Sequence, residues 1–186
     1  MSMDAIRFFA RTAPSVHGGI DDREIRQLRL DPTMVIDFSS NQSPLGPSPL
    51  AVHAMQTAMI DRYPDRDALS LAEALAARHG VSPSQVVTGN GTTEIIRLIA
   101  QLAIGVGDRA LIFGPTFGEY AVATELAGGT LHIYPLSRKN AFQPQVREWL
   151  AAVCDCNPRI AWICSPNNPT GTVMPAGAGV FALAAH

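Results

Sequence analysis

The chain has 186 residues, of which 47% are hydrophobic, so it is long enough to bury one sizeable core. Its formal net charge of −2 comes with no basic stripe, which argues against nucleic acid and anionic membrane surfaces as partners. No apolar run approaches the roughly 18 residues of a membrane span, and no signal-like segment opens the chain, so we expect a cytoplasmic protein that binds a small molecule.

The first half of the chain reads as helices separated by loops and one strand. Asp21 is placed to cap the first helix, and Gly80 to end the third. The proline-rich stretch NQSPLGPSP can only be a loop. The elements predicted here are a helix over residues 22–30, a strand over 34–39, a helix at about 49–60 and a helix at about 68–79.

From residue 85 onward, strands and helices alternate regularly. The predicted order is strand 85–89, helix 92–104, strand 109–114, helix 118–128, strand 130–136, helix 144–154 and strand 159–165. Such alternation implies right-handed crossovers and a mostly parallel sheet flanked by helices, which is an α/β fold. Ligands of such sheets gather at the carboxyl ends of the strands.

A glycine turn between a predicted strand and a predicted helix is a candidate anion site. Gly89, Asn90 and Gly91 lead into a helix whose first turn holds Thr92 and Thr93. Unpaired N–H groups at a helix N-terminus suit a phosphate. The turn is neither a P-loop nor G-x-G-x-x-G, and a simple tight turn with Thr92 as the helix cap is the alternative interpretation.

Two further loops follow predicted strands at the same edge. Phe117, in PTFGEY, offers a ring that could stack on a planar ligand. Asn168, in NNPTG, offers an amide for a ligand oxygen. Taken singly, the ring could equally be core packing and NNPTG a plain turn.

The three cysteines do not have the spacing of a metal site. Cys154, Cys156 and Cys164 lie within eleven positions but lack paired C-x-x-C motifs. We predict buried or half-buried thiols and no metal.

The motifs RYPD, GNGTTE, PTFGEY and SPNNPTG, in this order and spacing, resemble those of the class I/II aminotransferases, pyridoxal-phosphate enzymes of fold type I. The resemblance covers about residues 33–172. Within the family, the chain is similar to the branch containing histidinol-phosphate aminotransferase and threonine-phosphate decarboxylase, and VHGG with IDFSSNQSPLGPSP is most similar to the decarboxylase of cobalamin biosynthesis.

The resemblance implies a cofactor, pyridoxal 5'-phosphate (PLP), and the residues that bind it. Gly91 and Thr92 would hold its phosphate, with Asn90 and Thr93 close by. Phe117 would stack on the pyridine ring and Asn168 would bond the 3-hydroxyl. Tyr63 would reach the phosphate of the partner's cofactor across the interface of a homodimer.

The resemblance also implies a substrate, a phosphorylated amino acid or amine. Asn41 and the backbone near Gly46 would lie beside its carboxylate, and His17 with Gly18 would meet its phosphate. Ser43 departs from the family's usual N-x-N-P-L-G pattern. Whether the substrate is decarboxylated or transaminated stays open.

The aspartate aminotransferase-like large domain implied by the resemblance is expected to be truncated here. Residues 1–45 would form an N-terminal arm and small-domain segment, and residues 46–186 an incomplete PLP-binding domain. The only lysine, Lys139, lies in a polar loop, PLSRKN, and we assign it to the surface. The family's Schiff-base lysine would lie downstream of N-P-T-G, so no catalytic residue is assigned to this chain.

Two other interpretations remain open. One is a non-catalytic, truncated PLP-binding or interaction module. The other is a Rossmann-like nucleotide binder that uses GNGTTE, which leaves PTFGEY and NNPTG unexplained.

Overall fold

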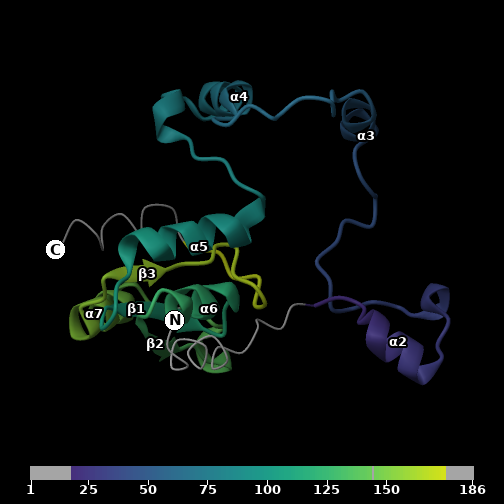
Figure 1. The fold of residues 1–186 in the computed structure, drawn as a ribbon. Helices are drawn as coiled ribbons and strands as arrows, with labels where there is room; N and C mark the ends of the chain where they lie inside the picture. Colours follow the sequence, from purple (N-terminus) through teal and green to yellow (C-terminus); the bar gives the residue numbers. More distant parts are fainter. Residues whose placement is uncertain (1–17, 144, 175–186) are drawn as a thin grey trace, which may run out of the picture. The chain divides into compact units, whose positions relative to one another are not determined.

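The structure is a computed structural model that describes residues 18–143 and 145–174. The described chain forms two compact units, one ending at Thr88 and the other beginning at Gly89 (Figure 1). The predicted site residues Gly18, Asn41, Gly46 and Tyr63 belong to the first unit, and the predicted anion turn belongs to the second.

The first unit consists of short helices. They are α2 (Asp22–Leu28), the 3₁₀ turn η1 (Pro32–Met34), α3 (Pro49–Gln56), α4 (Leu69–His79) and the 3₁₀ turn η2 (Pro83–Gln85). Asp21 caps α2 as predicted, because its carboxylate accepts the backbone N–H of Arg23 at 2.8 Å. Gly80 ends α4 in the left-handed conformation, φ 66°, which glycine adopts without strain.

The strand predicted over residues 34–39 is wrong. Met34 closes η1, and Ile36 and Phe38 are 79% and 94% exposed. The carboxylate of Asp37 accepts bonds from the hydroxyls of Ser39 and Ser40, which folds this segment into a local turn. Local side-chain bonds of this kind compete with a sheet, and no strand of the described part lies alongside to pair with the segment.

The helix predicted to end near Ile60 ends earlier. The hydroxyl of Thr57 donates to the carbonyls of His53 at 3.0 Å and Ala54 at 3.3 Å. The His53 carbonyl also accepts the backbone N–H of Thr57 at 3.1 Å, whereas the N–H of Ala58 bonds to Met55 and leaves the Ala54 carbonyl to the Thr57 hydroxyl, so α3 closes at Gln56.

The second unit has the predicted strand and helix order. Its elements are α5 (Gly91–Ala103), β1 (Arg109–Gly114), α6 (Glu119–Leu126), β2 (Thr130–Pro135), the 3₁₀ turn η3 (Arg138–Asn140), α7 (Val146–Cys156) and β3 (Ile160–Trp162). The strands are parallel in the order β2-β1-β3, so the predicted α/β fold with a parallel sheet flanked by helices is confirmed. The strand predicted at residues 85–89 is wrong: Gln85 closes η2 and no described strand pairs with the segment after it.

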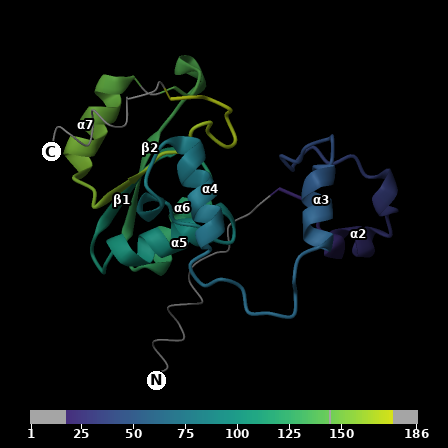
Figure 2. The same cartoon turned by 90° about the horizontal axis from the view of Figure 1, so that it is seen from above.

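Strand β1 forms the centre of the sheet and contributes to both halves of the core. Ala110 and Ile112 pack with residues of α5 and α6, whereas Leu111 and Phe113 pack with residues of α7. This follows from the two-residue period of a strand. Figure 2 shows α7 on one side of the strands and α5 and α6 on the other. Helices on both faces leave the ends of the strands for binding.

Candidate functional site

The glycine turn opens α5 with unobstructed space at its first residue. Gly91 is the first residue of the helix and has φ 79°. A side-chain Cβ built there would meet no atom within 4 Å. The N–H groups of Thr92 and Thr93 lie in the first turn, where a helix has no acceptor of its own, and Asn90 makes no capping bond to them. The turn therefore exposes donors at the positive end of the helix dipole.

Asn90 and Glu94 fix the shape of this turn. The backbone N–H of Asn90 donates to the Glu94 carboxylate at 2.5 Å, and its side-chain amide donates to the same oxygen at 3.2 Å. Chiefly the backbone bond, and then the side-chain bond, lower the pKa of Glu94. The side-chain amide of Asn90 therefore points toward Glu94. The polar groups of the turn that stay available to a ligand are those of Thr92 and Thr93.

The loop after β1 carries Phe117. The peptide between Gly114 and Pro115 is cis, and α6 begins at Glu119. Phe117 is half-buried and meets Tyr120 edge-on, with ring centroids 5.9 Å apart. Its ring thus packs partly in the core and is partly open to a ligand. Core packing and stacking on a planar ligand are therefore compatible for this residue.

The loop after β3 carries two asparagines in different environments. Asn167 is 8% exposed, whereas Asn168 is exposed. The side chain of Asn167 bonds to Pro115, Thr116 and Thr170. Sequence reasoning singled out Asn168 and missed Asn167, although the doubled asparagine before proline was the available signal.

These three loops lie at one end of the sheet. Parallel strands place the loops after β1 and β3 at the same carboxyl edge. Since α5 joins β1 through a short connection, residues 104–108, it runs back along the sheet and begins near that edge. In Figure 1, the start of α5 and the yellow loop after β3 both lie at the right of this unit. The fold therefore gathers the turn at Gly91, the loop at Phe117 and the loop at Asn168.

Sequence reasoning also missed an ion pair beside this edge. Glu119, in the first turn of α6, is 1% exposed. Arg97 of α5 donates to one of its oxygens through Nη2 at 2.9 Å and Nε at 3.2 Å. The glutamate, as the single charged residue of the PTFGEY stretch, was the available signal for it.

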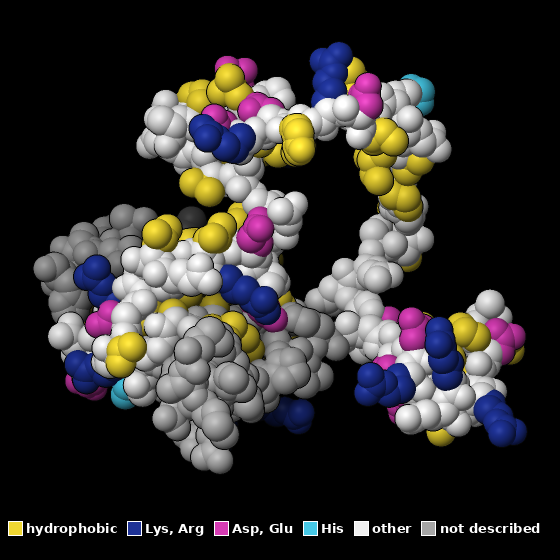
Figure 3. Space-filling view, viewed as in Figure 1, with side chains coloured by type: hydrophobic (Ala, Val, Ile, Leu, Met, Phe, Trp, Pro, Cys, Tyr) yellow, Lys and Arg dark blue, Asp and Glu magenta, His cyan; other side chains and the backbone are white. Residues whose placement is uncertain are grey.

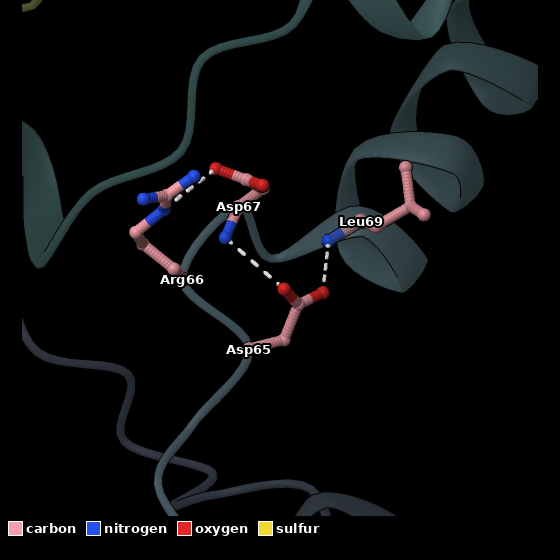
Figure 4. A network of polar contacts seen from close by, with 4 residues as sticks. All are labelled: Asp65, Arg66, Asp67 and Leu69. Carbon is pink, nitrogen blue, oxygen red and sulfur yellow. Dashed lines mark hydrogen bonds and ion pairs between the residues drawn. The ribbon is translucent and has the colours of Figure 1, made fainter.

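Tyr63 lies in the loop between α3 and α4 of the first unit and is fully exposed. The next part of that loop is held by Asp65, whose carboxylate accepts the backbone N–H groups of Asp67 at 3.1 Å and Leu69 at 2.8 Å (Figure 4). The RYPD motif thus combines a structured aspartate with an uncovered tyrosine ring.

The predicted substrate residues of the first unit lie on two touching loops and a turn. A Cβ at Gly18 would fall 1.7 Å from the carbonyl oxygen of Ser39, so only glycine allows this approach, which brings Gly18 to the segment before Asn41. Hydrogen bonds from Ser39 and Ser40 lower the pKa of Asp37 in that segment to about 2. Asn41 and Gly46 are exposed, and His17 lies outside the described residues.

Other predicted features take the following places. Lys139 is exposed, as predicted. Cys156 is buried and Cys164 half-buried, but Cys154 is exposed, because it lies off the face of α7 formed by Trp149, Val153 and Cys156. Within residues 18–143 and 145–174, no group of three His, Cys, Asp or Glu residues is placed to hold a metal ion. No helix in these ranges is long and apolar enough to cross a membrane.

The fold and the site together define an α/β protein with a candidate anion site at the carboxyl edge of a parallel sheet. The family model for aminotransferases of class I and II matches residues 33–178, and the chain belongs to this family. The resemblance drawn from the four motifs is thereby confirmed.

Individual relatives agree with this assignment. Histidinol-phosphate aminotransferase from Moorella thermoacetica is 41% identical over 142 residues, which are 75% of this chain and 36% of that protein. The chain thus spans less than half the length of the curated relatives it matches.

Solved structures share the fold. Histidinol-phosphate aminotransferase from Sinorhizobium meliloti, in complex with pyridoxal-5'-phosphate, matches with a TM-score of 0.70 and 26% identity, over 78% of this chain and 40% of that one. L-threonine-O-3-phosphate decarboxylase from Porphyromonas gingivalis matches with a TM-score of 0.59 and 30% identity, over 74% and 41%. The expectation of a PLP-dependent family is confirmed.

Proposed function

We propose that the second unit binds PLP and forms part of an enzyme that acts on a phosphorylated amino acid or amine. The observation that carries this proposal is the exposed turn at Gly91, gathered with Phe117 and Asn168 at one sheet edge. The residues fit the cofactor chemically: open space and N–H donors for a phosphate, an aromatic ring for a planar heterocycle, and an exposed amide for a hydroxyl.

Each residue has a distinct part in this proposal. Gly91 and Thr92 bind the phosphate, Thr92 through its backbone N–H and its hydroxyl and Gly91 by the open space at its Cα, with Asn90 and Thr93 beside them. The N–H of Gly91 itself donates to the Gly89 carbonyl at 2.9 Å. Phe117 covers one face of the ring and excludes water from it, and Asn168 orients the ring through the 3-hydroxyl. When bound, PLP supplies an electron sink for charge that develops at the substrate's Cα.

The substrate assignment rests on the relatives and on the first unit. Several curated relatives are histidinol-phosphate aminotransferases, which favours transfer of an amino group from a phosphorylated amine. Decarboxylation of threonine phosphate, the reaction resembled by VHGG, is the second candidate, favoured by the structural match to that decarboxylase. Either way, His17 and Gly18 would bind the substrate phosphate, and Asn41 and Gly46 would lie by its carboxylate.

A PLP titration tests the cofactor proposal. We expect saturable binding to the chain, followed by absorbance, and a loss of affinity of about tenfold to a hundredfold in Thr92→Ala, since a hydrogen bond to a charged group is worth about 1.5–3 kcal/mol. Thr130→Ala, an exposed threonine at the first residue of β2, is the matched control and should bind PLP like the parent. Equal affinity of the parent and Thr92→Ala for PLP would contradict the assignment of Thr92 to the phosphate. Absence of saturable binding would contradict the proposal that the second unit binds PLP.

The substrate proposal needs a separate assay on the protein produced from the native gene. Amino transfer from histidinol phosphate to a 2-oxo acid would support the first candidate. Release of carbon dioxide from threonine phosphate would instead establish the second. If the protein binds PLP but catalyses neither reaction, the proposed substrate class is contradicted. The cofactor assignment would still hold in that case.

A further inference from the structure

We propose that Asn167 is a positioning residue that joins the two loops carrying Phe117 and Asn168, and so sets how both meet the cofactor. This inference rests on the proposed PLP site. It concerns a side chain that touches neither ring nor phosphate in the proposed arrangement and acts only through its neighbours.

The side-chain amide of Asn167 bridges segments about fifty residues apart in the sequence. Its Oδ1 accepts the hydroxyl of Thr116 at 2.7 Å, and its Nδ2 donates to the carbonyl of Pro115 at 2.9 Å. The carbonyl can only accept, so this bond also fixes which end of the amide faces which partner. The loop before Phe117 is thus held by two bonds from one side chain.

The same amide organises its own loop. The second Nδ2 hydrogen reaches the hydroxyl oxygen of Thr170 at 2.7 Å. The backbone N–H of Asn167 donates to the Thr172 carbonyl at 2.8 Å, and its carbonyl accepts the Gly171 N–H at 2.7 Å. Asn168 therefore lies in a turn, residues 167–172, that these hydrogen bonds close, and it is itself exposed.

Burial raises the cost of losing the hydrogen bonds of the Asn167 side chain. Asn167 is 8% exposed, and both its amide nitrogen and its oxygen have partners. Water cannot readily replace a lost bond at a buried amide, so removal of the bridge is expected to release both loops rather than to be absorbed by solvent. Thr116 directly precedes Phe117 in one loop, and Asn167 directly precedes Asn168 in the other. A small shift of either loop therefore moves a proposed cofactor contact.

The test compares PLP with an analogue that lacks the 3-hydroxyl, and with inorganic phosphate, by equilibrium binding to the full chain. The parent should prefer PLP over the 3-deoxy analogue by about fivefold, the value of one neutral hydrogen bond. Asn168→Ala should abolish this preference. In Asn167→Ala the preference should fall toward one although Asn168 is still present, while affinity for phosphate stays within about twofold of the parent.

Two variants of Thr116 make the test independent of any folding defect in Asn167→Ala. Thr116→Val removes only the 2.7 Å bond to Oδ1 and should reduce the preference for PLP. Thr116→Ser keeps the hydroxyl and should restore it. Asn140→Ala, a half-buried asparagine in η3 whose Oδ1 has no hydrogen-bond partner among the described residues, is the matched control and should behave like the parent.

The outcomes separate this inference from the proposed function. An unchanged preference in Asn167→Ala, or in Thr116→Val where Asn167→Ala does not fold, would overturn the positioning role and leave PLP binding intact. An equal loss for PLP, the analogue and phosphate would show a purely structural role and overturn it as well. A parent chain that fails to bind PLP would refute both proposals together.

Discussion

Tyr120 lies at the centre of an aromatic group in the second unit. Its ring stacks on Trp162, with centroids 5.2 Å apart, and meets Phe117 edge-on. Burial, and then the hydrogen-bonding and electrostatic interactions with Cys164, raise the pKa of Tyr120 from 10.0 to about 12. Its phenol is therefore protonated throughout the neutral range, and its contact with Phe117 is independent of pH there.

A raised pKa of this kind predicts loss of stability in alkali. Below pH 10 the phenol is protonated in the folded and unfolded states, so its contribution is fully present. Between about pH 10 and 12 only the unfolded state ionises, and the free energy of unfolding should fall. Ultraviolet titration should show one phenolate appearing near pH 12, and Tyr120→Phe should remove that step. Completion of all tyrosine ionisation by pH 11 would contradict this prediction.

Gly129 is required for a close approach rather than for its backbone angles. A Cβ there would lie 2.5 Å from Cγ2 of Ile104 and 3.2 Å from the Asp108 carbonyl. Gly129→Ala should lower the free energy of unfolding by about 1–3 kcal/mol, the usual cost of overpacking. Gly105→Ala is the control, since its nearest atom would be Asp108 Oδ2 at 3.5 Å, an ordinary contact. Chemical denaturation of the two variants decides it, and equal midpoints would contradict the steric argument.

The two asparagines show how far sequence reasoning reached at single positions. Asn168 was singled out by the motif, and its function stays a prediction. The burial of Asn167 was not foreseeable, because its partners Pro115 and Thr116 are about fifty residues away in the sequence. Capping residues were foreseeable, since Asp21 bonds to an N–H only two residues away.

Helices α5 and α6 are joined by the Arg97–Glu119 pair. The Glu119 side chain is 2% exposed and that of Arg97 46%. Arg97→Met should lower the free energy of unfolding by about 2 kcal/mol, because a buried carboxylate loses a charged donor. Arg66→Met is the matched control: its pair with Asp67, at 3.5 Å, is 92% and 74% exposed and should be worth less than about 0.5 kcal/mol. Thermal denaturation yielding the same melting temperature for both variants would refute this difference.

The predicted elements held where the hydrophobic pattern coincided with a partner to pack against. Strand β1 was placed correctly over residues 109–114, and its alternate residues fill the two halves of the core. The strands predicted at 34–39 and 85–89 have similar β-branched patterns but no neighbouring strand in the described structure. Strand propensity describes fit to a half-buried surface, and without that surface the pattern forms no sheet.

The first unit leaves large apolar side chains uncovered. Phe38 and Ile60 are each 94% exposed, and Tyr63 is fully exposed. Figure 3 shows hydrophobic side chains gathered over α3 and the segment before it. Exposed apolar groups at this density are typical of interaction surfaces, and the homodimer stays a prediction that can be tested there.

We expect analytical ultracentrifugation at micromolar concentration to give a molecular mass of twice the 19.8 kDa of one chain. Phe38→Asp should shift the equilibrium toward the monomer, because a carboxylate would have to be desolvated in the interface. Val106→Asp is the control, since Val106 is equally exposed but belongs to the second unit. A monomer across the whole concentration range would contradict the predicted homodimer.

Local signals along the chain were sufficient for the family, the order of strands and helices in the second unit, and the glycine turn that opens α5. These features depend on neighbouring residues: caps, periodicity and motif spacing act over a few positions. Three features required the folded chain: which strands have partners, which of two adjacent asparagines is buried, and the pairing of Arg97 with Glu119. Each depends on contacts between distant segments, and a buried hydrogen bond or strand pair exists only once folding has brought its two sides together.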